Sequence, residues 1–442
     1  MRKVAPVVKR VRFIGYAVPT TPADVVAVGD PDDTGSLAGT YRALGDRDAD
    51  IDARVAVIKA AVDRAREVLP ADEPDVLNVF VAPEFFWHGV HGPYVHGPAD
   101  PDPADVILDR LTAALPPDEY PGFLMVLGTV ITTKVADIDS VFASQSTRVR
   151  NDVVRALGEA WNSVTGPMQT VVADALINFI KNCHAYPDVE VRNRSLILSA
   201  HPIDGILEPI GAHAVTTEKN FDSNEDFLLW DVTGKDVVTE QMTAYPVLDL
   251  TGGDFKADAR DPLSVFRIGG EHPRSVGVEI CLDHSDRRLR KGIDRNPWPE
   301  RADGLDLQLI PSSGMQLHQA SIGARAGGWV FNCDGQYRLG SESDAGTAQH
   351  AVIAGVPCAF VDYRDPAGAS FGAHSQLTRV ERAAVRGDDA APGAHDAVLE
   401  APTDVDVGVF PVAQADDFDA VFAGGPGALH IYGLRSPIVL SG

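Results

Sequence analysis

Short apolar runs, rich in β-branched residues and bounded by turn-forming residues, recur along the chain. Residues 76–82 form such a run, and it stops at Pro83, as a strand buried on both faces would. Residues 51–69 instead carry apolar side chains at three- and four-residue spacing, which predicts an amphipathic helix. Because several strands near the core are separated by helical or loop segments, the pattern favours an α/β layered protein. The other runs predicted as strands are residues 11–18, 123–131, 195–199, 227–232, 276–280, 305–310, 329–332 and 356–361.

Two stretches look like additions to this core. Residues 134–190 contain two apolar stripes at helical spacing, which are interrupted at Gly166 and Pro167. We therefore expect a helical hairpin as an insertion. Residues 241–274 are rich in Asp, Gly and Pro and show no clear period, so we expect a long loop near a functional site.

The charge balance narrows the classes of partner. The 442 residues include 38 Lys or Arg and 63 Asp or Glu, for a formal net charge of −25. Such a surface repels phosphate backbones and anionic membrane faces, so neither nucleic acid nor a membrane is an expected partner. No apolar run approaches the ~20 residues of a membrane-spanning helix. The four cysteines are sparse, which is typical of reduced thiols, and we expect a cytoplasmic protein.

Cys281 follows the apolar run 276–280 directly, and Asp283 and Ser285 after it offer helix N-cap chemistry. On a tight turn before the start of a helix, the helix N-terminus favours the thiolate form of a cysteine. Main-chain N–H groups nearby can also stabilise an oxyanion. The same pattern also fits a buried apolar cysteine at a strand end, since free cysteine is among the most buried residue types. The segment alone leaves both interpretations open.

Glu84 follows the strand predicted at residues 76–82 and precedes three aromatic residues. Such a desolvated environment should raise the pKa of the carboxyl group toward the range of a general base. Lys219 follows a loop and precedes an aromatic residue. Nothing local distinguishes Lys219 from an ordinary surface lysine.

Taken together, Glu84, Lys219 and Cys281 occur in that order, each at the end of a strand-like run. This arrangement resembles the Glu-Lys-Cys triad of the nitrilase superfamily, the carbon-nitrogen hydrolases. The resemblance spans roughly residues 11–375. It departs from the family after the cysteine, where an aromatic residue and Pro-Glu are common and this chain has Asp-His-Ser-Asp-Arg-Arg at 283–288. Further matching segments, in order, are PEFF, PGFLMVLGTVI, VRNRSLIL with Asn193, DLQLIPSSG and WVFNCDG.

The resemblance implies a four-layer α-β-β-α sandwich of α/β class, with one carbon-nitrogen hydrolase domain over residues 1–442. Residues 407–442 would be a C-terminal tail of the kind that often crosses to a partner subunit, and a homodimer or higher homo-oligomer is expected. No cofactor and no metal are implied. His88, His91 and His96 could suggest a metal site, but no nearby carboxylate or cysteine completes the ligand spacing, and their loop would rather line a pocket.

The resemblance also implies roles for individual residues. Cys281 would be the nucleophile and Glu84 the general base, while Lys219 and the main-chain N–H of Leu282 would stabilise the oxyanion. A second glutamate usually follows the lysine, and Glu225 is the nearest candidate.

Candidate residues for substrate contact surround these motifs. The segment after the cysteine supplies two arginines whose planar guanidinium groups suit a carboxylate or phosphate, although local ion pairs with Asp283 and Asp286 are the alternative. The candidates are Trp87, His88, His284, Arg287, Arg288 and Ser312.

We therefore expect a cysteine-dependent hydrolase of a non-peptide C–N bond, acting on a small-molecule amide through a thioester acyl-enzyme. Nitrile hydrolysis, or carbamoyl or acyl transfer, on the same triad is the alternative within this chemistry. A non-catalytic nitrilase-like binding or scaffold protein is the alternative of another class, and the presence of all three triad residue types argues against it.

Overall fold

The computed structural model describes most of the chain around the predicted site. The described residues are 7–21, 26–27, 37–38, 41–70, 73–89, 92–97, 99–135, 156, 159–160, 162–172, 189–206, 209–219, 228–233, 236–241, 264–269, 272–290, 304–340, 346–366, 371–384 and 396–441.

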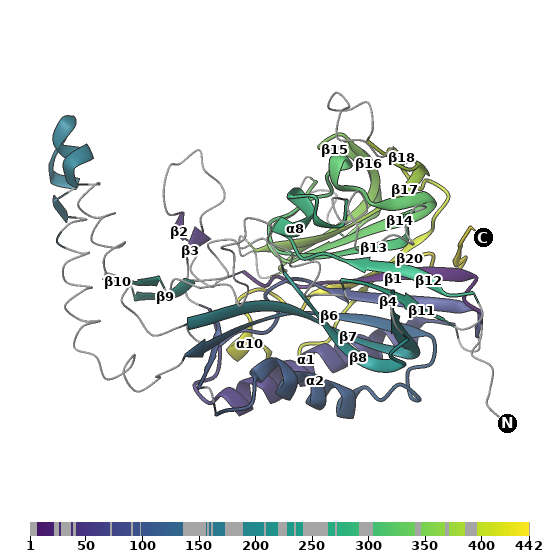
Figure 1. The fold of residues 1–442 in the computed structure, drawn as a ribbon, viewed down its shortest axis with the longest axis horizontal. Coiled ribbons are helices and arrows are strands. Elements are labelled where there is room, and N and C mark those ends of the chain that lie inside the picture. Colours follow the sequence, from purple (N-terminus) through teal and green to yellow (C-terminus); the bar gives the residue numbers. More distant parts are fainter. Residues whose placement is uncertain are drawn as a thin grey trace.

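The fold is mostly β, and the predicted four-layer α-β-β-α sandwich is wrong. Seventeen strands form one hydrogen-bonded sheet of mixed parallel and antiparallel pairing (Figure 1). Among the described residues only two helices are substantial, α1 (Arg47–Val68) and α2 (Pro103–Ala114). An apolar run predicts that both faces of a strand are buried, but it does not say what covers them. Here strands of the same sheet supply much of that cover.

The elements have the following bounds in chain order. The strands of the large sheet are β1 (Arg10–Ala17), β4 (Val76–Ala82), β5 (Tyr94–His96), β6 (Phe123–Val135), β7 (Val189–Gly205), β8 (Ala212–Glu218), β11 (Val265–Ile268), β12 (Arg274–Val278), β13 (Leu305–Ser312), β14 (Ala324–Asp334), β15 (Gln349–Ile353), β16 (Val356–Arg364), β17 (Gly372–Arg382), β18 (Val398–Glu400), β19 (Val407–Pro411), β20 (Ala428–Tyr432) and β21 (Ile438–Val439). Two small antiparallel pairs are β2 (Val26–Ala27) with β3 (Leu37–Ala38), and β9 (Leu228–Thr233) with β10 (Asp236–Gln241). The short helices are α8 (Leu282–Ser285), η3 (Gln319–Ser321) and α10 (Phe418–Val421).

Two parallel runs of strands carry the predicted site. In the first run, β4 pairs in parallel with both β1 and β6, and in the second, β13 pairs in parallel with both β12 and β14. Strands β7 and β11 pair antiparallel and connect the two runs. Within a parallel run the carboxyl ends of the strands lie on the same side of the sheet, so residues that follow neighbouring strands lie close together.

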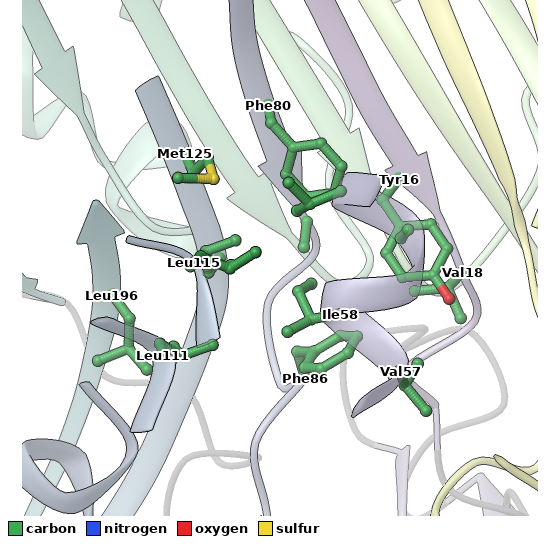
Figure 2. Close-up of a cluster of buried hydrophobic side chains, with 14 of the residues drawn as sticks. Tyr16, Val18, Val57, Ile58, Phe80, Phe86, Leu111, Leu115, Met125 and Leu196 are labelled. Atoms are coloured by element: carbon green, nitrogen blue, oxygen red, sulfur yellow. The ribbon is translucent and has the colours of Figure 1, made fainter. Parts of the chain in front are cut away.

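Helix α1 begins because Asp46 accepts a hydrogen bond from the N–H of Ala49 and so caps the first turn. Its apolar face then packs onto the sheet, where Ile58 lies close to Phe80 and Phe86 (Figure 2). Burying each such side chain stabilises the fold by roughly 1.5–3 kcal/mol.

No helix in the described part of the chain combines the length and the apolar character that crossing a membrane requires.

The opposite face of β1 packs against another part of the same sheet. Because side chains alternate along a strand, Phe13 and Tyr16 of β1 lie on opposite faces. Tyr16 joins the core under the helices, whereas the Phe13 ring lies 5.3 Å from that of Phe331 and 6.3 Å from that of Trp329, both on β14. This second core explains how β1 is buried on both sides without a second helical layer.

The expected insertions and tail are described only in part. Most of residues 134–190 lies outside the described residues. Of those described, residues 156, 159–160, 162–163 and 167–172 are helical, whereas 134–135 and 189–190 belong to strands β6 and β7. The segment 241–274, expected as a loop, contains strand β11. Residues 407–442, expected as a tail, supply three strands of the large sheet, and β20 pairs antiparallel with β1 of the same chain.

Candidate active site

The structure brings Glu84, Lys219 and Cys281 together. Glu84 follows β4, Lys219 follows β8, and Cys281 lies between β12 and α8. Lys219 Nζ donates to Glu84 Oε1 at 3.0 Å, and both side chains are buried. Glu84 and Lys219 both shift the pKa of the Cys281 thiol, in opposite directions. A proton acceptor, a cation and a nucleophilic sulfur thus share one buried cluster.

Hydrogen bonds hold Glu84 at both its main chain and its carboxylate. Pro83 ends β4, after which the N–H of Glu84 donates to the carbonyl of Ser312 at 3.3 Å and its own carbonyl accepts from Thr20 Oγ1 at 2.7 Å. Asn193 Nδ2 donates to Glu84 Oε1 at 3.0 Å, the same oxygen that accepts from the lysine. Two donors on one carboxylate oxygen fix its position.

Cys281 adopts a backbone conformation that is rare outside glycine. Its φ is 44° and its ψ −105°, which costs a side-chain-bearing residue roughly 1–3 kcal/mol. Main-chain bonds hold the turn: the N–H of Cys281 donates to Pro311 at 3.1 Å, and its carbonyl accepts from the N–H of His284 at 2.8 Å. The sulfur itself donates to the carbonyl of Ser313 at 3.6 Å, and Leu282 follows as the first residue of α8. A strained, well-held turn of this kind is common where a nucleophile must be presented.

The electrostatics of the site keep the thiol protonated at rest. Burial raises the pKa of Cys281 well above its ordinary value, and the Glu84 carboxylate raises it further. Lys219 lowers the same pKa but does not reverse the shift. The resting sulfur is therefore a thiol, and Glu84 is the charged group whose effect on its pKa is largest.

Ser312 is buried and belongs to the support of the nucleophile turn. Its hydroxyl lies 2.7 Å from Asn332 Oδ1 and 2.9 Å from Asp334 Oδ2. That Asp334 oxygen also accepts the N–H groups of Gly314 and Met315, at 2.7 and 2.8 Å. These bonds fix the loop whose carbonyl at position 313 accepts from the cysteine sulfur. The placement favours a structural role for the serine over substrate contact.

His284 is likewise buried and forms part of an internal network. Its Nε2 accepts the main-chain N–H of His318 at 2.9 Å, so the ring proton lies on Nδ1 and is donated to Glu279 Oε1 at 2.6 Å. Gln308 Nε2 donates to the same Glu279 oxygen, and the N–H of Leu289 donates to the other. This network braces the short helix after the nucleophile.

The two arginines after the nucleophile have different environments. Arg287 is exposed, with a φ of 62°. Arg288 is only 1 % exposed and pairs with the buried carboxylate of Asp283 at 3.0 Å. Its guanidinium also donates to the main-chain carbonyl of Glu218. For Arg288 the structure therefore has the local ion pair that was the alternative to substrate recognition.

Trp87 and His88 lie in the core next to the Glu84 loop. Trp87 is fully buried, and its Nε1 donates to the carbonyl of Leu127 at 2.7 Å. His88 Nδ1 accepts from the Arg54 guanidinium at 3.3 Å. Burial and the Arg54 charge lower the pKa of His88 well below its ordinary value, so the ring is neutral. Both placements favour support of the loop over contact with a substrate.

Two residues that interact with the candidate triad were given no role from the sequence. Asn193 was noticed only through the family resemblance, and its bond to Glu84 depends on the pairing of β6 with β7. Tyr337 is half-buried, and burial, Asp334 and Cys281 together raise its pKa. No local pattern marks either residue. Glu225 lies outside the described residues.

Comparison of the sequence with protein-family models and with curated proteins found no match. Within the described residues, no group of three or more His, Cys, Asp or Glu side chains is arranged to hold a metal ion. His91 lies outside them, and His88 is engaged by Arg54.

Proposed function

We propose that the protein is a cysteine-dependent hydrolase that cleaves the C–N bond of a small-molecule amide through a thioester intermediate. The observation that carries the proposal is the buried Glu84–Lys219 ion pair beside Cys281 on a strained turn. A buried ion pair rarely adds net stability, because removing both charges from water is expensive. Its burial beside a nucleophilic side chain is therefore better explained by chemistry than by folding.

In the acylation step, Cys281 Sγ attacks the amide carbonyl carbon while its proton passes to Glu84. A C–S bond forms, and the electron pair of the carbonyl moves onto oxygen, where Lys219 and the main-chain N–H of Leu282 stabilise the negative charge. When the C–N bond breaks, the leaving amine or ammonia takes the proton from Glu84.

In the deacylation step, the oxygen of a water molecule attacks the thioester carbon while Glu84 accepts a proton from that water. The C–S bond then breaks, and the departing sulfur recovers the proton from Glu84. The products are a carboxylic acid and the free thiol, so the enzyme returns to its starting state without a cofactor.

The burial of the sulfur supports a small substrate. Cys281 is 8 % exposed, and Ile280 and Met315 pack with it. A folded polypeptide presenting a peptide bond would need a more open approach to the sulfur than this. The resemblance to the carbon-nitrogen hydrolases also supports amide chemistry, although the fold expected from it is not observed.

Intact-mass spectrometry tests the proposal. The wild-type protein is mixed with a panel of small primary and secondary amides and quenched in acid after short times. We expect a mass increase equal to the acyl half of the accepted amide, located on Cys281 by peptide mapping, together with release of the amine.

The matched control is Cys358→Ser, which alters another buried cysteine, located on β16. Cys358→Ser should form the adduct and Cys281→Ser should not. An adduct that persists in Cys281→Ser, or amine release at the wild-type rate by that variant, would refute the assignment of Cys281 as the nucleophile.

A further inference from the structure

Arg288 connects two segments of the candidate site that are far apart in the sequence. Its Nη1 donates to Asp283 Oδ2 at 3.0 Å, two residues after the nucleophile. The same nitrogen donates to the main-chain carbonyl of Glu218, the last residue of β8. The next residue is Lys219, so one guanidinium bridges the nucleophile segment and the lysine.

The bond to Glu218 acts on the peptide group that carries the lysine. The carbonyl of Glu218 and the N–H of Lys219 belong to the same planar peptide unit. Arg288 donates to the oxygen of that peptide unit. The N–H of the same unit, which belongs to Lys219, donates to the carbonyl of Asn193 at 2.8 Å. Since the side chain of Asn193 donates to Glu84, this single peptide unit is tied to all three parts of the triad.

The burial of Arg288 carries a cost in desolvation of its charge, which the bonds of this bridge must offset. Charged side chains are almost never fully buried unless they are paired, and its neighbour Arg287 is exposed. The flexible side chain of Lys219 is held at its ammonium end by Glu84 at 3.0 Å, so the peptide that Arg288 binds fixes its other end. A displacement of about 1 Å in a catalytic group can cost roughly 10²-fold in rate.

We propose that Arg288 is a positioning residue, which fixes Lys219 relative to Cys281 by holding the peptide between Glu218 and Lys219. This inference rests on the proposed function, because the position of the lysine matters only if it acts on the sulfur.

The test is a double-mutant cycle on the reactivity of Cys281. The rate constant for alkylation of Cys281 by iodoacetamide is measured at one pH for the wild type, Arg288→Met, Lys219→Met and the double variant. Lys219 lowers the pKa of the thiol, so Lys219→Met should slow alkylation. Arg288→Met should slow alkylation by about tenfold when Lys219 is present. In the Lys219→Met background it should slow alkylation by less than about twofold, because Arg288 acts through Lys219.

A matched control is Arg12→Met. Arg12 is also 1 % exposed and donates to main-chain carbonyls, those of Gly433 and Leu434, but it lies on β1 away from the triad. It should lower the thermal stability without changing the alkylation rate. Arg288→Lys, which keeps a cation for Asp283, should recover part of the rate lost in Arg288→Met.

Alkylation of Arg288→Met at the wild-type rate would overturn the proposal, as would an equal slowing with and without Lys219. If Arg288→Met does not fold, Asp283→Asn removes the anion that holds the guanidinium and should slow alkylation in the same lysine-dependent way. Failure of the proposed function is a separate result, because it is read from the absence of an acyl adduct on wild-type Cys281.

Discussion

At Cys281, two opposite charges act on one thiol. The Glu84 carboxylate raises the pKa of Cys281 in addition to the effect of burial, and Lys219 lowers it. The sum leaves a thiol at neutral pH, unlike cysteines that rest as thiolates beside a histidinium or a long helix. Transfer of the thiol proton to Glu84 neutralises the carboxylate and leaves the thiolate beside the lysine. The arrangement thus suits a proton that moves during the attack.

Glu84→Gln should separate turnover from thiol reactivity. The amide keeps the shape but cannot accept a proton, so kcat should fall by about 10²–10⁴. Alkylation of Cys281 should be as fast as in the wild type or faster, because a charge that raises the thiol pKa has been removed. Both rates are measured at the same pH, with iodoacetamide as the alkylating agent.

A buried carboxylate elsewhere provides the control for Glu84→Gln. Asp362 is fully buried and accepts the N–H groups of Leu339 and Gly340, so Asp362→Asn should cost stability and leave kcat unchanged. Unchanged turnover in Glu84→Gln would remove Glu84 from the mechanism. An equal fall in turnover and alkylation would mean that the carboxylate activates the resting thiol.

Lys219→Met should reduce both stability and turnover. It leaves the buried Glu84 carboxylate without its cation, which costs about 3–5 kcal/mol in the free energy of unfolding. It also removes an oxyanion partner, at a cost of about 10²–10³ in kcat. Urea unfolding gives the first quantity and steady-state kinetics the second.

The double variant of Glu84→Gln and Lys219→Met should be more stable than Lys219→Met alone, since no isolated charge remains buried. Turnover should not recover with stability. Strictly additive losses of stability would show that the two groups are not coupled in the folded protein.

At the scale of single elements, the sequence predicted what local patterns determine. The run at residues 76–82 is confirmed as β4, and the three- and four-residue spacing at 51–69 is confirmed within α1. The three residues that the structure brings together were selected through the family resemblance, because nothing local distinguishes Lys219 from a surface lysine. The pattern did not reveal β11 or the burial of Arg288, because a short strand in a polar segment and a paired buried charge both look like solvated surface in a sequence.

The C-terminal strands should be essential for folding. β20 pairs with β1 and contributes Leu429 and Ile431 to the core under the helices. A chain truncated after residue 406 would expose the edge of β1 and that apolar surface. We expect it to be insoluble or to lack a cooperative thermal transition, as measured by solubility and circular dichroism. A soluble truncated protein with the wild-type transition would show that these strands form a separable tail.

At the scale of the whole molecule, the pairing of distant strands decides the architecture. β1 pairs with β20, more than four hundred residues away, and nothing in the alternation of either segment specifies its partner. The α-β-β-α expectation failed at this level because cover for a sheet can come from helices or from other strands. The packing of these strands also buries polar groups, among them histidines whose pKa burial lowers: His88, His96, His201 and His430.

These histidines make the stability of the molecule depend on pH on the acid side. Burial, together with a smaller effect of His374, lowers the pKa of His430 from 6.5 to about 3. As the pH falls below 6.5, the unfolded chain binds a proton at this residue and the folded chain does not. Stability from His430 is therefore complete above the unfolded pKa and is lost as the pH falls toward the folded value.

His430→Gln should weaken this pH dependence. Each pH unit in the window corresponds to about 1.4 kcal/mol, so between pH 7 and pH 5 the wild type should lose about 2 kcal/mol through this residue. The glutamine has no such titration and keeps a polar group for Ser375 Oγ, which lies 2.9 Å from His430 Nδ1. Urea unfolding of both proteins at the two pH values measures the difference. Equal losses would mean that His430 takes up its proton in the folded state as readily as in the unfolded chain, contrary to its burial between β1 and β19.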